Sequence, residues 1–150
     1  MMDGLAIRTA SPTDLDALRD VFRRASLSNE GDRDTLLAHP EVLEFAGDGI
    51  DEGRTRVATL DERVVGFSTV VELGNVDDLE DLFVDPDWMR HGVGLALMRD
   101  VVERARARGA RYVEVTANEH ALAFYAQAGF LPHGEADTRF GRAARLQIVL

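Results

Sequence analysis

A long amphipathic helix is predicted over Gly92–Arg108, because apolar residues recur there about every four positions. Gly109, directly after it, is typical of a helix C-terminus. β-rich runs precede and follow the helix, at Leu79–Val84 and Tyr112–Ala117. A helix between two strands packs on a sheet, so this order limits the chain to α/β architectures. The apolar positions are Val93, Leu97, Val101 and Ala105, with Met98 and Val102 alongside.

The segments on either side predict one α/β domain over residues 1–150, with a mixed central β-sheet flanked by helices. A hairpin is expected where Asp61-Glu62-Arg63 separates two β-rich runs. The other expected elements are helices starting at Ser11 and over Asp34–Phe45 and Glu119–Ala128, strands over Leu5–Arg8, Thr55–Leu60, Val64–Leu73 and Arg145–Leu150, and loops or turns over Asn29–Asp32, Gly47–Gly53 and Gly74–Asp78.

Composition excludes several function classes. The chain lacks cysteine, so it has neither a disulfide framework nor a thiol nucleophile, which fits a cytoplasmic protein. Its net charge of −10 disfavours nucleic acid and anionic membranes as partners. The same charge would attract a cationic substrate, although an acidic surface more often serves solubility alone. We find neither a signal-peptide pattern nor an apolar run long enough to cross a bilayer.

The segment from Leu82 to Gly94 has the chemistry of an anion site. A strand ends, a turn follows, and Gly92 and Gly94 open the long helix. The first turn of a helix has free N–H groups and the positive end of the helix dipole, which predicts a phosphate site around Arg90–Leu95. The alternative is that the two glycines only permit close packing. Leu97 replaces the third glycine of a dinucleotide fingerprint, and no Walker tripeptide is present.

A second segment, Asn118–Phe130, admits structural and functional interpretations. Asn118 suits a helix N-cap, and Tyr125 shares a helix face with Ala121 and Ala128 as a core tyrosine would. Taken alone, the segment favours these structural roles.

Together the two segments resemble the signature motifs of the GNAT N-acetyltransferases. The loop is similar to the family pattern Gln/Arg-x-x-Gly-x-Gly/Ala, and Asn118–Phe130 is similar to Asn-x-x-Ala-x-x-aromatic-Tyr followed by Gly-Phe. The run Val64-Val65-Gly66-Phe67 also resembles part of the family's hairpin. The resemblance covers about residues 55–131. One departure is Met89, which stands where the family has Arg or Gln and puts a side-chain contact to pyrophosphate in doubt, although Arg90 offers a substitute.

The resemblance implies transfer of an acetyl group from acetyl-CoA to a primary amine by direct attack in a ternary complex. The acceptor would be a small molecule or a peptide, contacted by residues 26–53 and 132–144, and a homodimer is possible. Tyr125 would lie near the cofactor sulfur and donate to the leaving thiolate. The residues implied in cofactor binding are Leu82, Phe83 and Val84 through their backbone, Arg90, His91, Gly92, Val93, Gly94 and Leu95 through their amides, and Asn118 and Phe124.

A base must remove a proton from the amine, because an alkyl amine with a pKa near 10.4 is protonated at neutral pH. Glu80 is the first candidate, with Asp81 and Glu114 as rivals. Taken singly, each of the three is more typical of a solvated residue of the sheet. No two of the four histidines have a metal-ligand spacing, so no metal is expected. Two alternatives stay open: a GNAT-like domain that binds an acyl-CoA without catalysis, and an interaction domain without a cofactor.

Overall fold

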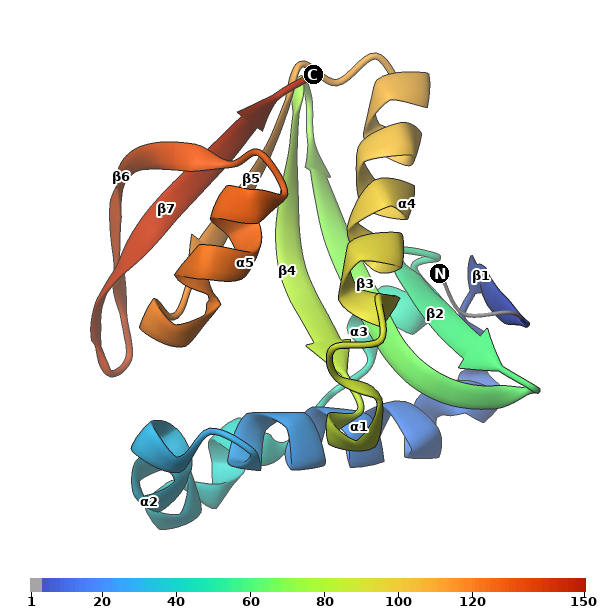
Figure 1. Ribbon diagram of the computed structural model, residues 1–150, viewed down its shortest axis with the longest axis vertical. Coiled ribbons are helices and arrows are strands. Elements are labelled where there is room, and N and C mark those ends of the chain that lie inside the picture. Colours follow the sequence, from blue (N-terminus) through green and yellow to red (C-terminus); the bar gives the residue numbers. More distant parts are fainter. Residues whose placement is uncertain (1–3) are drawn as a thin grey trace. The chain divides into compact units, whose positions relative to one another are not determined.

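The computed structural model describes residues 4–150, which form a mixed sheet of seven strands with helices packed against it (Figure 1). The strands are hydrogen-bonded in the order β1-β2-β3-β4-β5-β7-β6. The β4–β5 pair is parallel, whereas β5–β7 is antiparallel. The strands are β1 Leu5–Thr9, β2 Thr55–Leu60, β3 Arg63–Leu73, β4 Val76–Val84, β5 Tyr112–Ala117, β6 Leu131–Thr138 and β7 Gly141–Val149, and the helices are α1 Leu15–Leu27, α2 Glu30–Ala38, α3 Asp48–Asp51, α4 Val93–Ala107 and α5 Leu122–Gln127.

The chain forms two compact units, which are described separately. The first unit comprises the described residues up to Thr69 together with Asp81–Leu97. The second comprises Val70–Glu80 and Met98–Leu150. β3, β4 and α4 each contribute residues to both units. No helix among residues 4–150 combines the length and the apolar character that crossing a membrane requires.

In the first unit, two apolar clusters form on β2 and β3. Neighbouring residues of a strand point to opposite faces, so Val57 and Ala58 of β2 belong to different clusters. The cluster around Val57 contains Leu18 of α1 and Phe67 of β3, and the cluster around Ala58 contains residues of α4. The sheet of this unit therefore has α1 on one face and the start of α4 on the other.

Gly66 on β3 permits the close approach of α4. A Cβ atom at this position would lie 3.0 Å from the carbonyl oxygen of Phe83, 3.0 Å from Val93 and 3.1 Å from Leu97. Any larger residue would push the helix or β4 away. Gly66 thus fixes the position of the α4 N-terminus against the strands.

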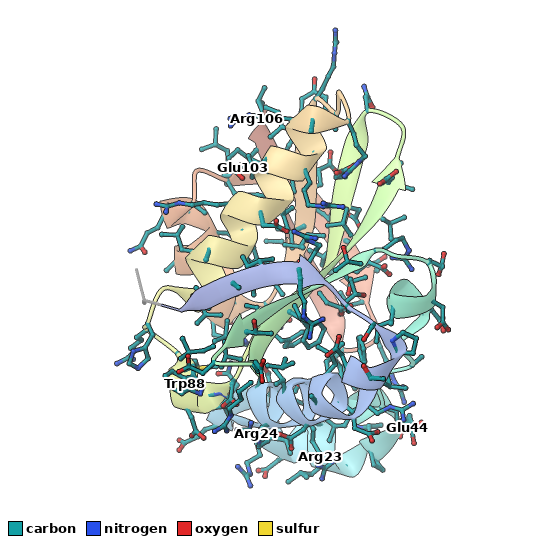
Figure 2. The ribbon with its side chains drawn as sticks, turned by 90° about the vertical axis from the view of Figure 1, so that its right-hand side faces the viewer. Arg23, Arg24, Glu44, Trp88, Glu103 and Arg106 are labelled. Atoms are coloured by element: carbon teal, nitrogen blue, oxygen red, sulfur yellow. The ribbon has the colours of Figure 1, made fainter. Side chains whose placement is uncertain are left out.

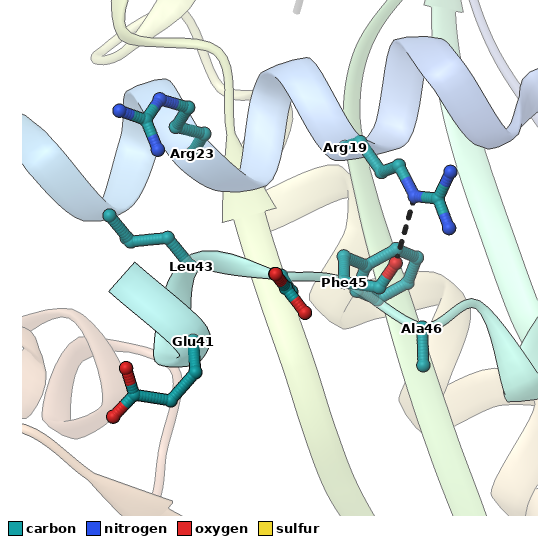
Figure 3. A pocket seen from close by; sticks show the side chains of 7 residues that line it. Arg19, Arg23, Glu41, Leu43, Phe45 and Ala46 are labelled. Atoms are coloured by element: carbon teal, nitrogen blue, oxygen red, sulfur yellow. Dashed lines mark hydrogen bonds between the residues drawn. The ribbon is translucent and has the colours of Figure 1, made fainter. Parts of the chain in front are cut away.

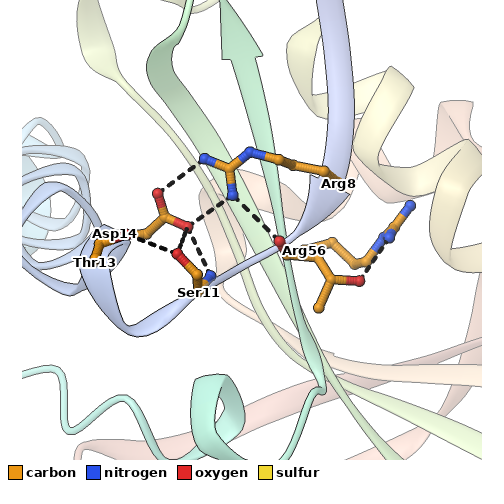
Figure 4. A network of polar contacts seen from close by, with 6 residues as sticks. Arg8, Ser11, Thr13, Asp14 and Arg56 are labelled. Carbon is orange, nitrogen blue, oxygen red and sulfur yellow. Dashed lines mark hydrogen bonds and ion pairs between the residues drawn. The ribbon is translucent and has the colours of Figure 1, made fainter.

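A polar network fixes the start of α1 (Figure 4). Ser11 and Pro12 lead into a single 3-10 turn, and α1 follows at Leu15. The buried carboxylate of Asp14 accepts two hydrogen bonds from Arg8, at 2.8 and 2.9 Å, and one from the Ser11 amide at 2.8 Å. The Arg8 guanidinium is the main reason that the pKa of Asp14 is lowered to about 2.

This network predicts a specific pH dependence of stability. Because the pKa of Asp14 is lower in the folded state, its stabilisation is present above the unfolded pKa near 3.9 and is lost as the pH falls towards 2. Replacing Asp14 by Asn should lower the free energy of unfolding at pH 7 by about 1–2 kcal/mol, a figure reduced because Arg8 is half exposed. Urea unfolding of both proteins at pH 7 and pH 3 measures this, and a difference that does not shrink at pH 3 would contradict the assignment.

The second unit is built around β5. Val113, Val115 and Ala117 alternate into the interior, and Tyr125 of α5 is buried as well. β5 pairs with β4 on one side and with β7 on the other. Gly129 ends the α5 segment with a φ of 100°, which confirms the predicted helix stop.

Several predicted boundaries were wrong. α2 already begins at Glu30 inside the predicted break, and the predicted loop Gly47–Gly53 contains the one-turn helix α3. β4 begins at Val76 because Val76–Leu79 pairs with β5, so the predicted turn is shorter than expected. The predicted helix Glu119–Ala128 starts as a 3-10 turn. β6 was missed altogether, since it is polar and exposed, contains proline and glycine, and is held by its pairing with β7.

Candidate active site

The predicted strand–loop–helix is present in the first unit. β4 ends at Val84, a 3-10 turn covers Pro86–Trp88, and α4 begins at Val93. Arg90 and Gly92 adopt left-handed backbone conformations, with φ of 65° and 87°. We call Arg90–Leu95 the cradle, because the first amides of α4 have no acceptor within the helix and point to where an anion can bind.

The structure separates two possible roles of Gly92. Nothing lies within 4 Å of a Cβ atom built on Gly92, so it does not serve close packing. Its positive φ explains the glycine, and the open space leaves room for a ligand. Met89 and Leu95 are both exposed at 41% of their surface, while Val93 is buried against β3. The buried side chain of Val93 thus anchors the cradle to β3, while Gly92 and Leu95 of the cradle are exposed.

An ion pair with a buried carboxylate, which sequence analysis missed, lies shortly before the cradle. Asp85 is 1% exposed, and Arg24 of α1 donates to both of its carboxylate oxygens, at 2.9 and 2.6 Å. These hydrogen bonds are the main cause of the lowered pKa of Asp85. Figure 2 shows Arg24 near Trp88, the last residue of the 3-10 turn. The only sequence signal is an arginine next to the buried helix positions Val21 and Ala25, which is too common to identify a partner.

The remaining predicted cofactor and acid residues lie in the second unit. Tyr125 is 6% exposed, packs against the rings of Phe124 and Phe130, and has its pKa raised to about 12 by burial. Asn118 occupies the predicted N-cap position, but its side chain makes no capping hydrogen bond. The structural role expected for Asn118 is thus only partly fulfilled.

The base candidates differ in their surroundings. Glu114 accepts hydrogen bonds from Arg145 and Gln147, each at 2.8 Å. Burial favours the protonated form, but these two donors outweigh it and lower the pKa of Glu114, which makes this carboxylate a poor base. Glu80 is exposed and Asp81 half-buried, and both make contacts with other residues. Asp77, a further acidic residue of β4, is buried and paired with Arg108.

A pocket of about 440 Å³ lies between α1 and the segment that follows α2 (Figure 3). Arg19 and Arg23 line it from α1, and Arg19 donates a hydrogen bond to the carbonyl of Phe45 at 3.1 Å. Glu41 and Glu44 bring the opposite charge. The rings of Phe45 and Phe22 contact each other, and Phe22 in turn contacts Phe83 of β4. The side chains that line the pocket thus carry both positive and negative charge. The other lining residues are Leu43 and Ala46.

No cluster of three or more His, Cys, Asp or Glu side chains among residues 4–150 could hold a metal ion. The predicted site residues are divided between the units. Leu82, Phe83, Val84 and the cradle belong to the first, and Glu80, Asn118, Phe124 and Tyr125 belong to the second.

Comparison with known proteins assigns the chain to a family. A sequence profile of the Acetyltransferase (GNAT) family matches residues 15–130. An uncharacterized N-acetyltransferase of Methanocaldococcus jannaschii is 33% identical over 90 residues, which cover 53% of this chain and 40% of that protein. A glucosamine 6-phosphate N-acetyltransferase of Trypanosoma brucei brucei is 38% identical over 58 residues, covering 39% of this chain and 40% of that protein. The chain thus spans less than half the length of these relatives.

Solved structures share the fold. The crystal structure of the PaiA N-acetyltransferase of Thermoplasma acidophilum, in complex with coenzyme A, superposes with a TM-score of 0.78. The match covers 97% of this chain and 99% of that one at 18% identity.

Proposed function

The chain belongs to the GNAT acetyltransferase family, and from this we propose that it transfers an acetyl group from acetyl-CoA to a primary amine. The observation that carries the proposal is the cradle: α4 begins directly after Gly92, and the space around a Cβ atom at Gly92 is open. The first amides of a helix have no acceptor within the helix and can bind an anion there. A pyrophosphate fits there because it is anionic and needs close approach to backbone N–H groups. The coenzyme A bound to the Thermoplasma acidophilum protein supports the same cofactor class.

In this proposal, the backbone of Leu82, Phe83 and Val84 binds the pantetheine arm, and the amides of the cradle bind the pyrophosphate. Asn118 and Phe124 supply further cofactor contacts. The exposed position of the Asn118 side chain and its lack of a capping hydrogen bond leave it available for this role. Acetyl-CoA brings a thioester whose carbonyl carbon the amine attacks.

The proposed chemistry needs a general base for the ammonium group and a hydrogen-bond donor for the leaving thiolate. Glu80 or Asp81, directly or through a water, takes a proton from the ammonium group, and the free amine forms a C–N bond to the acetyl carbon. A backbone N–H near Val84 stabilises the oxyanion that develops. The C–S bond then breaks, the nitrogen loses its second proton to water or to the thiolate, and the Tyr125 hydroxyl donates a hydrogen bond to the departing thiolate. We exclude Glu114 from the base role because its carboxylate is held by Arg145 and Gln147.

The burial of Tyr125 decides how far its proton moves. Its pKa of about 12 lies above that of a free thiol near 8.5, so complete proton transfer needs a dry site that raises the pKa of the thiol as well. Hydrogen-bond donation does not need that shift. We therefore propose that Tyr125 stabilises the thiolate without giving up its proton.

The cofactor proposal predicts that the protein binds acetyl-CoA with a dissociation constant in the micromolar range, which corresponds to roughly 8 kcal/mol. Calorimetric titration with acetyl-CoA and with analogues that lack the pyrophosphate measures the affinity and assigns it to the cradle. Absence of heat and of a thermal shift at millimolar acetyl-CoA would contradict it.

We propose that the pocket of the first unit contacts the acceptor, because five of its seven lining residues fall within the expected acceptor region, residues 26–53. Its mixed charge fits an amine that also carries an anionic group. Replacing Glu44 by Gln should then raise KM for the acceptor by about three- to tenfold and leave the affinity for acetyl-CoA unchanged. Steady-state kinetics with the best acceptor of an amine screen measures both, and an unchanged acceptor KM would place the acceptor elsewhere.

A further inference from the structure

Arg24 connects α1 to the loop in front of the cradle. Its guanidinium pairs with three carboxylates, at 2.9 Å to Asp20, 2.6 Å to Asp85 and 3.9 Å to Asp87. Asp20 and Asp87 are largely exposed, whereas Asp85 is 1% exposed. Loss of Arg24 should therefore affect stability mainly through Asp85, because a buried carboxylate is costly without its ion-pair partner.

Asp85 holds the junction between β4 and the loop by several contacts. Its amide donates to the carbonyl of Val65 on β3 at 2.8 Å, which continues the strand pairing. One carboxylate oxygen accepts from the Asp87 amide at 2.9 Å, which caps the 3-10 turn. The carboxylate also takes both hydrogen bonds from Arg24, while Arg63 lies farther away at 3.9 Å and is mostly exposed. The direction of the chain after β4 thus depends on a buried charge whose close partner is Arg24.

We propose that Arg24 is a positioning residue for cofactor binding: by pairing with Asp85 it holds the Asp85–Gly92 loop so that the cradle amides face the pyrophosphate. The inference rests on the proposed function of the cradle. Arg24 itself needs no contact with the cofactor. It acts because its two hydrogen bonds fix the orientation of the Asp85 carboxylate, which also accepts from the Asp87 amide and so caps the turn. Without Arg24 the carboxylate is free to turn towards water, and the loop loses its order.

The loop contains a natural fluorescent probe, Trp88. Trp88 is the single tryptophan of the chain, is half-buried, and lies at the end of the turn that Asp85 caps. Its ring centroid lies 5.8 Å from that of His91, within the cradle. Quenching of Trp88 fluorescence by acrylamide therefore measures how well this loop is ordered, without any ligand or turnover.

The test compares Arg24→Met with Asp20→Asn, which removes only the exposed partner of the same arginine. We expect Arg24→Met to make Trp88 more accessible to acrylamide and to raise the dissociation constant of acetyl-CoA by about tenfold or more. Asp20→Asn should leave both quantities at their wild-type values. Wild-type quenching and wild-type affinity in a folded Arg24→Met protein would overturn the proposal.

A double variant, Arg24→Met with Asp85→Asn, covers the case that Arg24→Met does not fold, since it removes the buried charge together with its partner. If Arg24 positions the loop, the double variant folds but keeps a more accessible Trp88 and weak acetyl-CoA binding. If Arg24 only neutralises Asp85, the double variant regains wild-type quenching and affinity, and the proposal fails. A wild-type protein that does not bind acetyl-CoA would contradict the proposed function, whereas the Trp88 comparison would still show whether Arg24 holds the loop.

Discussion

Replacing Tyr125 by Phe is expected to slow acetyl transfer by about ten- to a thousandfold while the fold and the affinity for acetyl-CoA stay almost unchanged. The ring and its contacts with Phe124 and Phe130 remain, so the packing of α5 is preserved. Only the hydroxyl is lost, and it matters mainly when negative charge develops on the sulfur. A hydrogen bond made chiefly in the transition state lowers the rate without changing ground-state binding.

The measurement is single-turnover kinetics, combined with a melting curve and an acetyl-CoA titration. Tyr112→Phe is the matched control, because Tyr112 is the only other tyrosine of the chain and lies half-buried on β5. A core role for Tyr125 predicts an unchanged rate, or a loss of stability if a buried partner is left unsatisfied. A folded Tyr125→Phe protein with the wild-type rate would exclude the donor role.

Replacing Gly94 by Val should weaken acetyl-CoA binding by about ten- to a hundredfold and change the stability of the fold far less. Gly94 lies in the first turn of α4, where the helical backbone conformation does not require glycine. A branched side chain there would keep the pyrophosphate away from the amides and remove about one charge-assisted hydrogen bond, worth about 1.5–3 kcal/mol. Gly92 is a poorer test, because its φ of 87° strains any other residue.

Gly31→Val is the control for Gly94→Val, since Gly31 occupies the same second position of α2 and a Cβ atom there meets nothing within 4 Å. Calorimetry and melting curves of both variants separate binding from folding. Normal acetyl-CoA affinity in a folded Gly94→Val protein would mean that the pyrophosphate binds elsewhere.

The elements that local sequence patterns specify were predicted well. Strands β2 and β5 have the expected bounds, and α4 differs by one residue at each end, because their apolar periodicity and flanking glycines determine them. The extent of β4 and the existence of β6 depend on pairing with β5 and β7 instead. A polar run with proline and glycine such as Leu131–Thr138 carries no strand signal of its own.

In the candidate site, too, features set by local sequence were predicted, and features set by contacts between distant residues were not. The cradle was predicted because a helix N-terminus with glycines is a local feature that binds anions by itself. The Arg24–Asp85 pair joins residues 61 positions apart, and no local pattern indicates which arginine meets which carboxylate. Glu114 stayed a base candidate in the sequence for the same reason, since Arg145 and Gln147 reach it from β7. Packing of distant elements determines the protonation of these groups.

Amine-dependent release of free CoA tests the central claim most directly. The purified protein is mixed with acetyl-CoA and with polyamines, amino acids, aminoglycosides or peptides with free N-termini, and thiol release is followed together with the mass of the amine. We predict that at least one class releases CoA in equal amounts with an acetylated amine, and only when protein, acetyl-CoA and amine are all present. Tight binding of acetyl-CoA without amine-dependent release of CoA for any class of amine would contradict the proposed acetyltransferase activity. It would favour a non-catalytic acyl-CoA-binding domain.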